Sequence, residues 1–257
     1  MDSPTILDVS DVTLRFGGVT ALQEASFSLK AGELFAIIGP NGAGKTSIFN
    51  CINGVYRPQN GSILFDGDEL IGESPVSVAR KGVGRTFQNL GLFMNLNLID
   101  NLLLGRHLQM KTGFLSGALW WGRAKNEEIK NRQKIEKIID LLELQPHRYQ
   151  PVGLLPYGIQ KRVELGRALS MEPRILLLDE PVAGMNLEET EDMARYILEI
   201  NNELGISILL VEHDMAMVMD IADIVMALDF GQTIATGSPK EVQNDQRVIA
   251  AYLGEAP

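Results

Sequence analysis

Apolar runs of two kinds follow one another along the chain and predict a sheet with interleaved helices. Residues Ile6–Phe16 alternate loosely between apolar and polar side chains, as a half-buried strand does, and Ala25–Leu29 reads as a second strand. Three further runs, Leu34–Ile38, Ile175–Leu178 and Ile206–Val211, are almost continuously apolar, which is typical of strands buried on both faces. Their alternation with helices indicates an α/β fold with a mostly parallel sheet.

A helical stretch interrupts this alternation between residues 89 and 172. Its clearest element is Ala124–Leu144, where the spacing of apolar side chains predicts an amphipathic helix. The side chains expected on its buried face are Ile129, Ile135, Ile138, Ile139 and Leu142. Residues Gly158–Ser170 are also predicted to be helical. We therefore expect residues 89–172 to form a helical subdomain inserted into the α/β part.

Polar residues mark where two later helices begin. Asn186 precedes a helix predicted to run to about Leu204, and Glu189, three residues on, completes a capping box. Ser238 and Glu241 show the same spacing at the start of a short helix. These signals place the start of each of the two helices.

The sequence Gly39-Pro40-Asn41-Gly42-Ala43-Gly44-Lys45-Thr46 fits the P-loop pattern G-x-x-x-x-G-K-[ST] without a mismatch. A buried strand precedes it and Ser47–Ile52 continues a helix after it, so phosphate would meet a helix N-terminus. The glycines allow successive backbone N–H groups to turn toward one anion. Lys45 is expected to reach the β- and γ-phosphates and Thr46 to hold Mg²⁺. Residues Gly39 to Ser47 are thus the predicted ATP site.

Two acidic residues, Asp179 and Glu180, end the apolar run Ile175–Leu178 and match a Walker B strand. The edge of a parallel sheet would deliver both carboxylates to the phosphate end of the P-loop. Asp179 is expected to support the Mg²⁺ shell and Glu180 to polarise the attacking water. Taken alone, the pair is equally well explained as solvated acids at the end of a strand. The P-loop upstream favours the nucleotide interpretation.

Composition narrows the class of protein further. The chain has 257 residues and a net charge of −10, which argues against a nucleic-acid footprint and against binding anionic lipid by charge. Its one cysteine, Cys51, excludes an internal disulfide. The N-terminus lacks a signal-peptide pattern, and the apolar runs are too short to span a membrane. We expect a cytoplasmic protein that works at a membrane only through partners.

The motifs, taken in order, resemble the ATP-binding subunit of ABC transporters over essentially the whole chain. After the P-loop come Gln88, a Tyr-Gly helix start, Asp179-Glu180, and His213 just past a strand. The resemblance implies that Gln88 is the Q-loop residue that contacts Mg²⁺ and that His213 is the switch histidine that touches the γ-phosphate. It also places Phe16 against adenine. Singly, each has a plainer explanation: Phe16 as strand core, Gln88 as a loop residue, His213 as an exposed turn residue.

What the resemblance implies extends to fold and partners. It implies a P-loop NTPase (RecA-like) core with an N-terminal antiparallel β part, built from residues 1–88 and 173–257, around the helical subdomain 89–172 in a single domain. The cofactors would be ATP and Mg²⁺. The resemblance implies a dimer, either with a second copy of this chain or with a paralogous ABC ATPase, in which Pro181–Asn186 is the D-loop that packs across the dimer. The other partners would be integral-membrane permease subunits and, indirectly, a substrate-binding protein, and no nucleic acid is expected. The protein would lie on the cytoplasmic side of the membrane.

Within that family, several segments look like the ATPases of branched-chain amino acid importers. They are Arg85–Gln88, Pro181–Asn186, Val211–Met215, Ala251–Gly254 and the insertion Lys111–Arg123. That group also takes urea, amides and aromatic acids. The resemblance therefore implies an importer of branched-chain or related amino acids and leaves the individual cargo open.

Two apolar clusters lie outside these motifs. Trp120 and Trp121 in the insertion form either a patch toward a membrane subunit or a contact with the following helix. Met215, Met217 and Met219 are expected to be core residues on a helix.

The family signature Leu-Ser-Gly-Gly-Gln departs from its usual form and stands here as Leu155-Pro156-Tyr157-Gly158-Ile159, followed by Gln160. In the family this motif acts in trans, and its Ser hydroxyl bonds the γ-phosphate held by the opposite subunit. Pro156 supplies neither that hydroxyl nor a backbone N–H, and Ile159 replaces a polar residue. Gly158 still lets the helix N-terminus face an anion. Alternatively, Pro156 only pre-sets the entry to the helix.

The altered signature raises the hypothesis of an asymmetric heterodimer, in which this subunit's own Walker site is completed by a partner's signature. One rival is a nucleotide-binding partner subunit that hydrolyses poorly, although Glu180 and His213 are intact. Another is a non-transport ABC ATPase acting on nucleic acid, which would need a basic face that the sequence lacks.

Overall fold

The computed structural model describes residues 3–86, 91–106 and 123–253. Two compact units divide the chain: Met1–Arg85 with Arg174–Pro257, and Thr86–Pro173. Gln88, Trp120, Trp121 and Gly254 lie outside the described residues, as does the insertion up to residue 122. No helix within the described ranges combines the length and hydropathy that a bilayer crossing needs.

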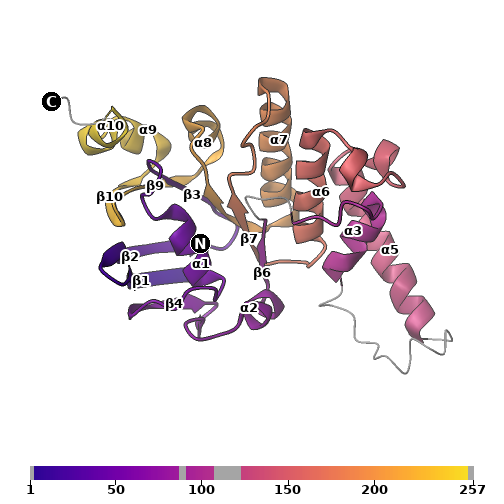
Figure 1. The fold of residues 1–257 in the computed structure, drawn as a ribbon, viewed down its shortest axis with the longest axis horizontal. Helices are drawn as coiled ribbons and strands as arrows, with labels where there is room; N and C mark the ends of the chain where they lie inside the picture. The colour runs from indigo at the N-terminus through magenta and orange to yellow at the C-terminus, as the bar shows by residue number, and fades with distance from the viewer. Residues whose placement is uncertain (1–2, 87–90, 107–122, 254–257) are drawn as a thin grey trace. The chain divides into compact units, whose positions relative to one another are not determined.

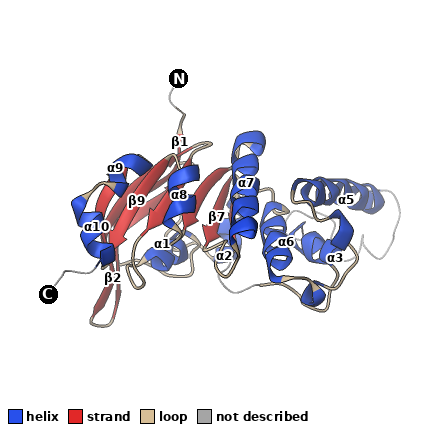
Figure 2. Ribbon diagram, turned by 90° about the horizontal axis from the view of Figure 1, so that it is seen from above, coloured by secondary structure: helices blue, strands red, loops and turns tan. Residues whose placement is uncertain are grey.

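The first unit contains a six-stranded sheet in the order β10-β9-β3-β8-β7-β6. Figure 2 shows the strands in red, with β7 and β9 of this sheet labelled. The strands of this sheet are parallel except for β10, which pairs antiparallel with β9. This confirms the predicted α/β fold with a mostly parallel sheet. The strand bounds are β3 (Leu34–Ile38), β6 (Val83–Arg85), β7 (Ile175–Asp179), β8 (Ser207–Val211), β9 (Ile224–Asp229) and β10 (Gln232–Gly237).

A second, antiparallel sheet of four strands has the order β2-β1-β4-β5. It supplies the N-terminal antiparallel β part that the resemblance implied. The second strand is longer than Ala25–Leu29, since pairing with β1 carries it through the polar positions on its solvent side. The bounds are β1 (Thr5–Phe16), β2 (Val19–Lys30), β4 (Asn60–Phe65) and β5 (Asp68–Glu69).

Both faces of the parallel sheet are buried, which explains why its central strands β3, β7 and β8 are buried at every position and are polar only at Asp179 and Ser207, at strand ends. In β3, Phe35 and Ile37 belong to a core that also contains side chains of the antiparallel sheet and of α1 (Lys45–Ile52). The alternate residues Ala36 and Ile38 are equally buried and point to the opposite face. The helix that follows the P-loop is thereby fixed between two sheets.

Two of the other helices of this unit, α7 (Leu187–Leu204) and α9 (Pro239–Gln243), begin at the predicted signals. Asn186 accepts from the Glu189 backbone N–H, and the Glu189 carboxylate accepts from the Asn186 N–H, which completes the capping box. At Ser238, the Glu241 carboxylate accepts hydrogen bonds from the Ser238 backbone N–H at 2.8 Å and from the Ser238 hydroxyl at 2.7 Å. The remaining helices of this unit are α2 (Pro75–Lys81), α8 (Met215–Ile221) and α10 (Gln246–Leu253).

The second unit is helical, as predicted, and α3, α5 and α6 lie together in Figure 1. A Cβ on Gly166 of α6 would lie 3.0 Å from Leu102 of α3 and 3.1 Å from Leu142, just beyond α5, so glycine permits this close packing. The elements are α3 (Leu98–Gly105), α5 (Arg123–Leu141), α6 (Tyr157–Leu169) and two short 3₁₀ turns, Gln145–His147 and Val152–Leu154.

The predicted apolar face of α5 is wrong at one position, because Ile129 is 45 % exposed. Ile129 lies six residues before Ile135, which rotates it by about 120° away from the buried stripe. The position that does continue the stripe is Asn131, which is buried and accepts a hydrogen bond from Arg106 Nε at 3.1 Å. A polar residue thus occupies the place that the apolar pattern assigned to an isoleucine.

The methionine prediction is correct for one residue only. Met217 is 6 % exposed, whereas Met215 and Met219 are half-buried. Residues two apart on a helix point in nearly opposite directions, so the three side chains cannot share one face.

Cys51 gives a direct test of how tightly α1 is enclosed. Its side chain is buried, and burial raises the pKa of the thiol to about 12. Because only the thiolate is nucleophilic, a rise of about three pKa units lowers the reactive fraction near pH 8 by roughly a thousandfold. We expect an aromatic disulfide reagent to label the folded protein at least about a hundredfold more slowly than the guanidinium-unfolded protein. Rapid labelling of the folded protein would show that α1 is not enclosed.

Candidate nucleotide-binding site

The P-loop connects β3 to α1 through a backbone that only glycine adopts easily. Gly39, Gly42 and Gly44 have φ angles of 151°, 84° and 104°. A Cβ on Gly39 would lie 2.1 Å from the Leu228 carbonyl oxygen, and one on Gly44 would lie 2.6 Å from that of Ala21. These two glycines are therefore required by close backbone packing against β9 and β2.

Gly42 differs, because a Cβ there would meet nothing within 4 Å. Its positive φ opens the loop toward free space, next to the exposed Asn41 and ahead of the exposed Thr46 in the first turn of α1. The first turn of α1 carries no acidic residue, and Gly44 provides no side-chain cap. The unsatisfied N–H groups and the positive end of the helix dipole are left for an anion.

Lys45 is a buried cation at the centre of this loop, with 6 % exposure. Its Nζ donates to the carbonyl oxygens of Gly39 at 2.7 Å and Pro40 at 3.0 Å. Burial lowers the pKa of Lys45, and the charges of Glu180, Asp179 and then Glu212 act in the opposite direction. Because burial is the larger effect, a further anion beside the ammonium would stabilise its charged form.

Asp179 ends β7 with 1 % of its side chain exposed, and Arg85 at the end of β6 holds it. Arg85 Nη2 donates to Asp179 Oδ2 at 2.9 Å, while Nη1 donates to Asn50 Oδ1 of α1 at 2.7 Å. The guanidinium also lies 5.6 Å from the ring centroid of Phe49. Arg85 thereby links the carboxyl end of two neighbouring strands to the helix that follows the P-loop, a role that the sequence reasoning missed.

Glu180, the next residue, has a φ of 48°. Such a conformation is strained for a residue other than glycine and occurs often at functional sites. Its backbone N–H donates to the Val211 carbonyl at 2.9 Å, which fixes the peptide against the end of β8. His213 Nδ1 lies 3.9 Å from Glu180 Oε1, and the His213 side chain is 56 % exposed. The structure thus brings Glu180 and His213 together at one end of the sheet.

Glu212 was also missed as a site residue, although it is fully buried. Its Oε1 accepts from the Val182 N–H at 3.1 Å, and its Oε2 accepts from the His213 N–H at 2.9 Å and the Asp214 N–H at 3.3 Å. This carboxylate ties the segment after β7 to the segment after β8. Its sequence signal was an acid at the end of an almost continuously apolar strand, where a buried charge needs several hydrogen-bond donors.

Phe16 lies at the end of β1 and is 47 % exposed, so it is not a strand-core residue. Its ring meets Tyr56 edge-to-face, with centroids 5.0 Å apart. An exposed ring supported by a second ring is a suitable platform for a flat aromatic ligand.

The altered signature lies in the second unit, at the start of α6. Pro156 is the N-cap residue and provides no side-chain hydrogen bond. Gln160 Nε2 donates to the Leu155 carbonyl at 2.8 Å, Gly158 is buried, and Tyr157 is 43 % exposed. Ile159 is half-buried. The N-terminal N–H groups of α6 remain without a capping side chain, which leaves them for an external acceptor.

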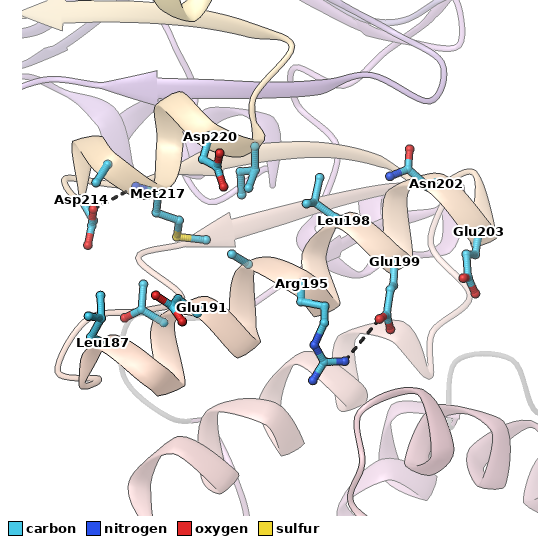
Figure 3. A pocket seen from close by; sticks show the side chains of 14 residues that line it. Leu187, Glu191, Arg195, Leu198, Glu199, Asn202, Glu203, Asp214, Met217 and Asp220 are labelled. Atoms are coloured by element: carbon cyan, nitrogen blue, oxygen red, sulfur yellow. Dashed lines mark hydrogen bonds and ion pairs between the residues drawn. The ribbon is translucent and has the colours of Figure 1, made fainter.

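A separate groove of about 620 Å³ lies between α7 and α8 (Figure 3). Its one guanidinium, Arg195, already pairs with Asp192 and Glu199 at 3.1 and 3.3 Å. A triphosphate would be repelled by the surrounding carboxylates, so this groove is unsuited to the nucleotide. The acidic side chains among its lining residues are Glu191, Glu199, Glu203, Asp214 and Asp220.

A strand, a glycine loop with a buried lysine, a helix, and two acids at the end of a neighbouring parallel strand define a P-loop NTPase. Comparison with known proteins narrows this class. The sequence pattern of the family described as ABC transporter matches residues 22–183, and that of the branched-chain amino acid ATP-binding cassette transporter matches residues 232–257. The chain belongs to the ABC transporter family.

The relatives match along their whole length. BraF of Pseudomonas aeruginosa, a high-affinity branched-chain amino acid transport ATP-binding protein, is 39 % identical over 99 % of this chain and 100 % of its own. LivG of Escherichia coli K12, described in the same words, is 41 % identical with the same coverage. The solved structure of MJ1267, an ATP-binding cassette of an ABC transporter, is 31 % identical with a TM-score of 0.85, covering 99 % of this chain and 100 % of that one.

The ion pair between Arg85 and Asp179 is expected to support the site structurally. Replacing Arg85 with Met leaves a buried carboxylate without its cation, which costs about 3 kcal/mol of unfolding free energy. Lys81→Met is the matched control, because its pair with Asp68 is exposed, and we expect it to change stability little. Urea denaturation of the two variants measures the difference. Equal stability of both variants would show that the buried pair contributes nothing.

Proposed function

We propose that this chain is the ATP-hydrolysing subunit of an ABC importer for branched-chain or related amino acids. The observation that carries the proposal is Lys45, a buried ammonium in the P-loop beside the charges of Glu180 and Asp179. A cation in this position suits the transfer of a phosphoryl group, whose charge it offsets. The class of cargo rests on the full-length relatives, which are described as branched-chain amino acid transport proteins.

In this proposal the P-loop from Gly39 to Ser47 binds the triphosphate. Backbone N–H groups around Gly42 and at the start of α1 surround the phosphates, and Lys45 transfers its hydrogen bonds from backbone carbonyls to the β- and γ-phosphates. Phe16 stacks on adenine, supported by Tyr56.

Mg²⁺ fits the oxygen donors present. The described residues hold no cluster of three or more His, Cys, Asp or Glu side chains for a metal, but Mg²⁺ commonly binds one or two protein oxygens together with phosphate and water. Thr46 would supply a hydroxyl, Asp179 would support the shell, and Gln88, outside the described residues, would add an amide oxygen. When bound, Mg²⁺ neutralises charge on the phosphates.

Hydrolysis would then depend on Glu180 and His213. The Glu180 carboxylate accepts a hydrogen bond from a water molecule and takes its proton as the water oxygen bonds to the γ-phosphorus. The bond between the γ-phosphorus and the bridging oxygen breaks, and its electron pair leaves with ADP. His213 contacts the γ-phosphate. Glu212 holds the His213 backbone but does not touch the substrate.

We further propose that the subunit works in a dimer bound to integral-membrane permease subunits on the cytoplasmic side of the membrane, with a substrate-binding protein delivering cargo. The chain would act as one cassette, with residues 1–88 and 173–257 as the core and residues 89–172 as the helical subdomain. Pro156 to Gln160 would act on the partner's nucleotide. Since Pro156 has no hydroxyl, the dimer would be asymmetric, with a paralogous subunit supplying the intact signature.

One observation favours an alternative function for the subunit. The uncapped start of α6 at Pro156 would suit a partner subunit that binds nucleotide and hydrolyses it poorly. The Glu180 carboxylate, close to both Lys45 and His213, favours the active subunit.

Glu180→Gln separates these possibilities. It removes the proton acceptor while keeping size and hydrogen bonding, so Mg-ATP turnover should fall by about a hundredfold or more with binding retained. Phosphate release measures turnover, and light scattering measures the oligomeric state with ATP bound. Unchanged turnover would contradict the assigned role of Glu180.

The oligomeric state of the same variant tests the heterodimer. If Glu180→Gln binds ATP and stays monomeric alone, the altered signature requires a different subunit. If ATP traps a homodimer, the altered signature is tolerated and the heterodimer proposal is wrong.

A further inference from the structure

The groove of about 620 Å³ between α7 and α8, called the α7–α8 groove below, uses a side of α7 that the core does not. Its residues on α7 recur every three or four positions from Leu187 to Asn202, so they form one stripe along the helix. The buried side chains Met193, Ile197 and Ile200 lie on a different stripe. The helix α7 therefore has a second, accessible face.

Apolar side chains line the α7–α8 groove from both helices. Leu187, at the start of α7, is 76 % exposed, and Ala194 and Leu198 farther along the helix are half-buried. Met217 of α8 is buried and lines the groove opposite α7 (Figure 3). A methionine adapts its shape to what packs on it. An accessible apolar row between two helices is typical of a surface that binds a partner.

Carboxylates stand beside this apolar row on both helices. Glu191, Glu199 and Glu203 come from α7, and Asp214 and Asp220 come from α8 and its N-cap (Figure 3). Glu191, Glu203 and Asp220 are exposed and form no ion pair within the described part of the chain. They are therefore available to cations from outside.

The guanidinium in the groove does not offset these charges, because it is already paired. Arg195 Nη2 donates to Asp192 Oδ1 at 3.1 Å, and Nη1 donates to Glu199 Oε1 at 3.3 Å. The same guanidinium lies 4.5 Å from the ring centroid of Tyr196. The groove thus keeps an excess of negative charge, which a cationic partner complements and a nucleic acid or an anionic lipid surface does not.

The spacing of the carboxylates fits a helical partner. Glu191, Glu199 and Glu203 are separated by eight and four residues, which places them about 12 Å and 6 Å apart along the axis of α7. Cations four and eight residues apart on a second helix recur at the same distances. The 18 residues of α7 span about 27 Å, so a helix of five turns can lie along it.

We propose that the α7–α8 groove is the docking site for a basic amphipathic helix of a partner protein. The apolar side of that helix packs on Leu187, Leu198 and Met217. Its lysine or arginine side chains pair with Glu203 on one wall and Asp220 on the other. Apolar contact supplies most of the affinity, and charge selects the partner. The proposal goes beyond the proposed function, since no residue of the groove was assigned to ATP or Mg²⁺.

A synthetic helix tests the charge of the occupant. The probe has about 18 residues, with leucine along one side, lysine on both flanks and alanine elsewhere, and fluorescence anisotropy measures its binding without nucleotide. We expect the full chain to bind one such peptide. A peptide with glutamate in place of every lysine should bind at least about tenfold more weakly. Equal binding of the two peptides would overturn the proposal.

The variant Glu203→Gln with Asp220→Asn places the peptide in the groove. It removes one carboxylate from each wall, and the Kd for the lysine peptide is expected to rise about three- to tenfold, as for two exposed ion pairs. Glu188→Gln with Asp100→Asn is the matched control, because it changes the net charge equally at two exposed positions outside the groove. If both variants bind equally, the peptide responds only to net charge and the proposal is wrong.

Leu187→Ser tests the apolar contact. Because Leu187 is exposed, the substitution leaves the core intact, and the Kd is expected to rise about tenfold, as for the loss of one leucine contact. Leu204→Ser is the control on the same helix, since Leu204 is 53 % exposed and lies outside the groove. Equal Kd values for these two variants would overturn the proposal.

Sedimentation of the chain without peptide tests the other occupant, a second copy. We expect Leu187→Ser to leave the oligomeric state of the nucleotide-free protein unchanged. If the wild type is a dimer that Leu187→Ser dissociates and Leu204→Ser does not, a second copy of this chain covers the groove and the proposed partner helix is wrong. All of these measurements are made without ATP, so they stand even if the protein does not hydrolyse it.

Discussion

One buried ammonium organises the nucleotide site. Lys45 is enclosed at the start of α1, bonded to the Gly39 and Pro40 carbonyls and facing the carboxylates that end β7 and β8. A buried cation is unfavourable unless anions or carbonyls surround it. The loop therefore has to turn its carbonyls inward toward Lys45, and the same turn directs its N–H groups outward. The loop can therefore bind phosphate through its N–H groups because its carbonyl groups are turned toward the Lys45 ammonium.

The rest of the fold holds this arrangement in place. Both faces of the parallel sheet are buried, so polar residues of its central strands are confined to the strand ends. At one such end Asp179 pairs with Val211, and Glu180 and Glu212 are the residues that follow this pair on the neighbouring strands β7 and β8. Arg85 joins Asp179 to α1, and Glu212 joins the loops after β7 and β8. Any shift of one loop is transmitted to the others through charged hydrogen bonds, which are stronger than neutral ones. A site built in this way suits a reaction that depends on positioning.

Much of this could be predicted from the sequence, because it follows from local rules. The apolar runs located β3, β7 and β8, and the P-loop pattern located the glycines and Lys45. The structural partners could not be predicted in the same way. Arg85 and Asp179 are far apart in sequence, and only the pairing of β6 with β7 brings them together. The prediction for Ile129 was wrong because the helical period gives the angles between side chains but does not show which side of the helix faces the core. Asn131 lies on the buried side instead, where it accepts a hydrogen bond from Arg106.

The most direct test of this account is the affinity of Lys45→Met for Mg-ATP, measured by calorimetry beside the wild type. The methionine fills the space of the lysine stem and removes the charge, so the affinity should fall about tenfold to a hundredfold, as for the loss of a charged hydrogen bond. Unchanged affinity would show that the triphosphate does not depend on Lys45, and the site would have to lie elsewhere.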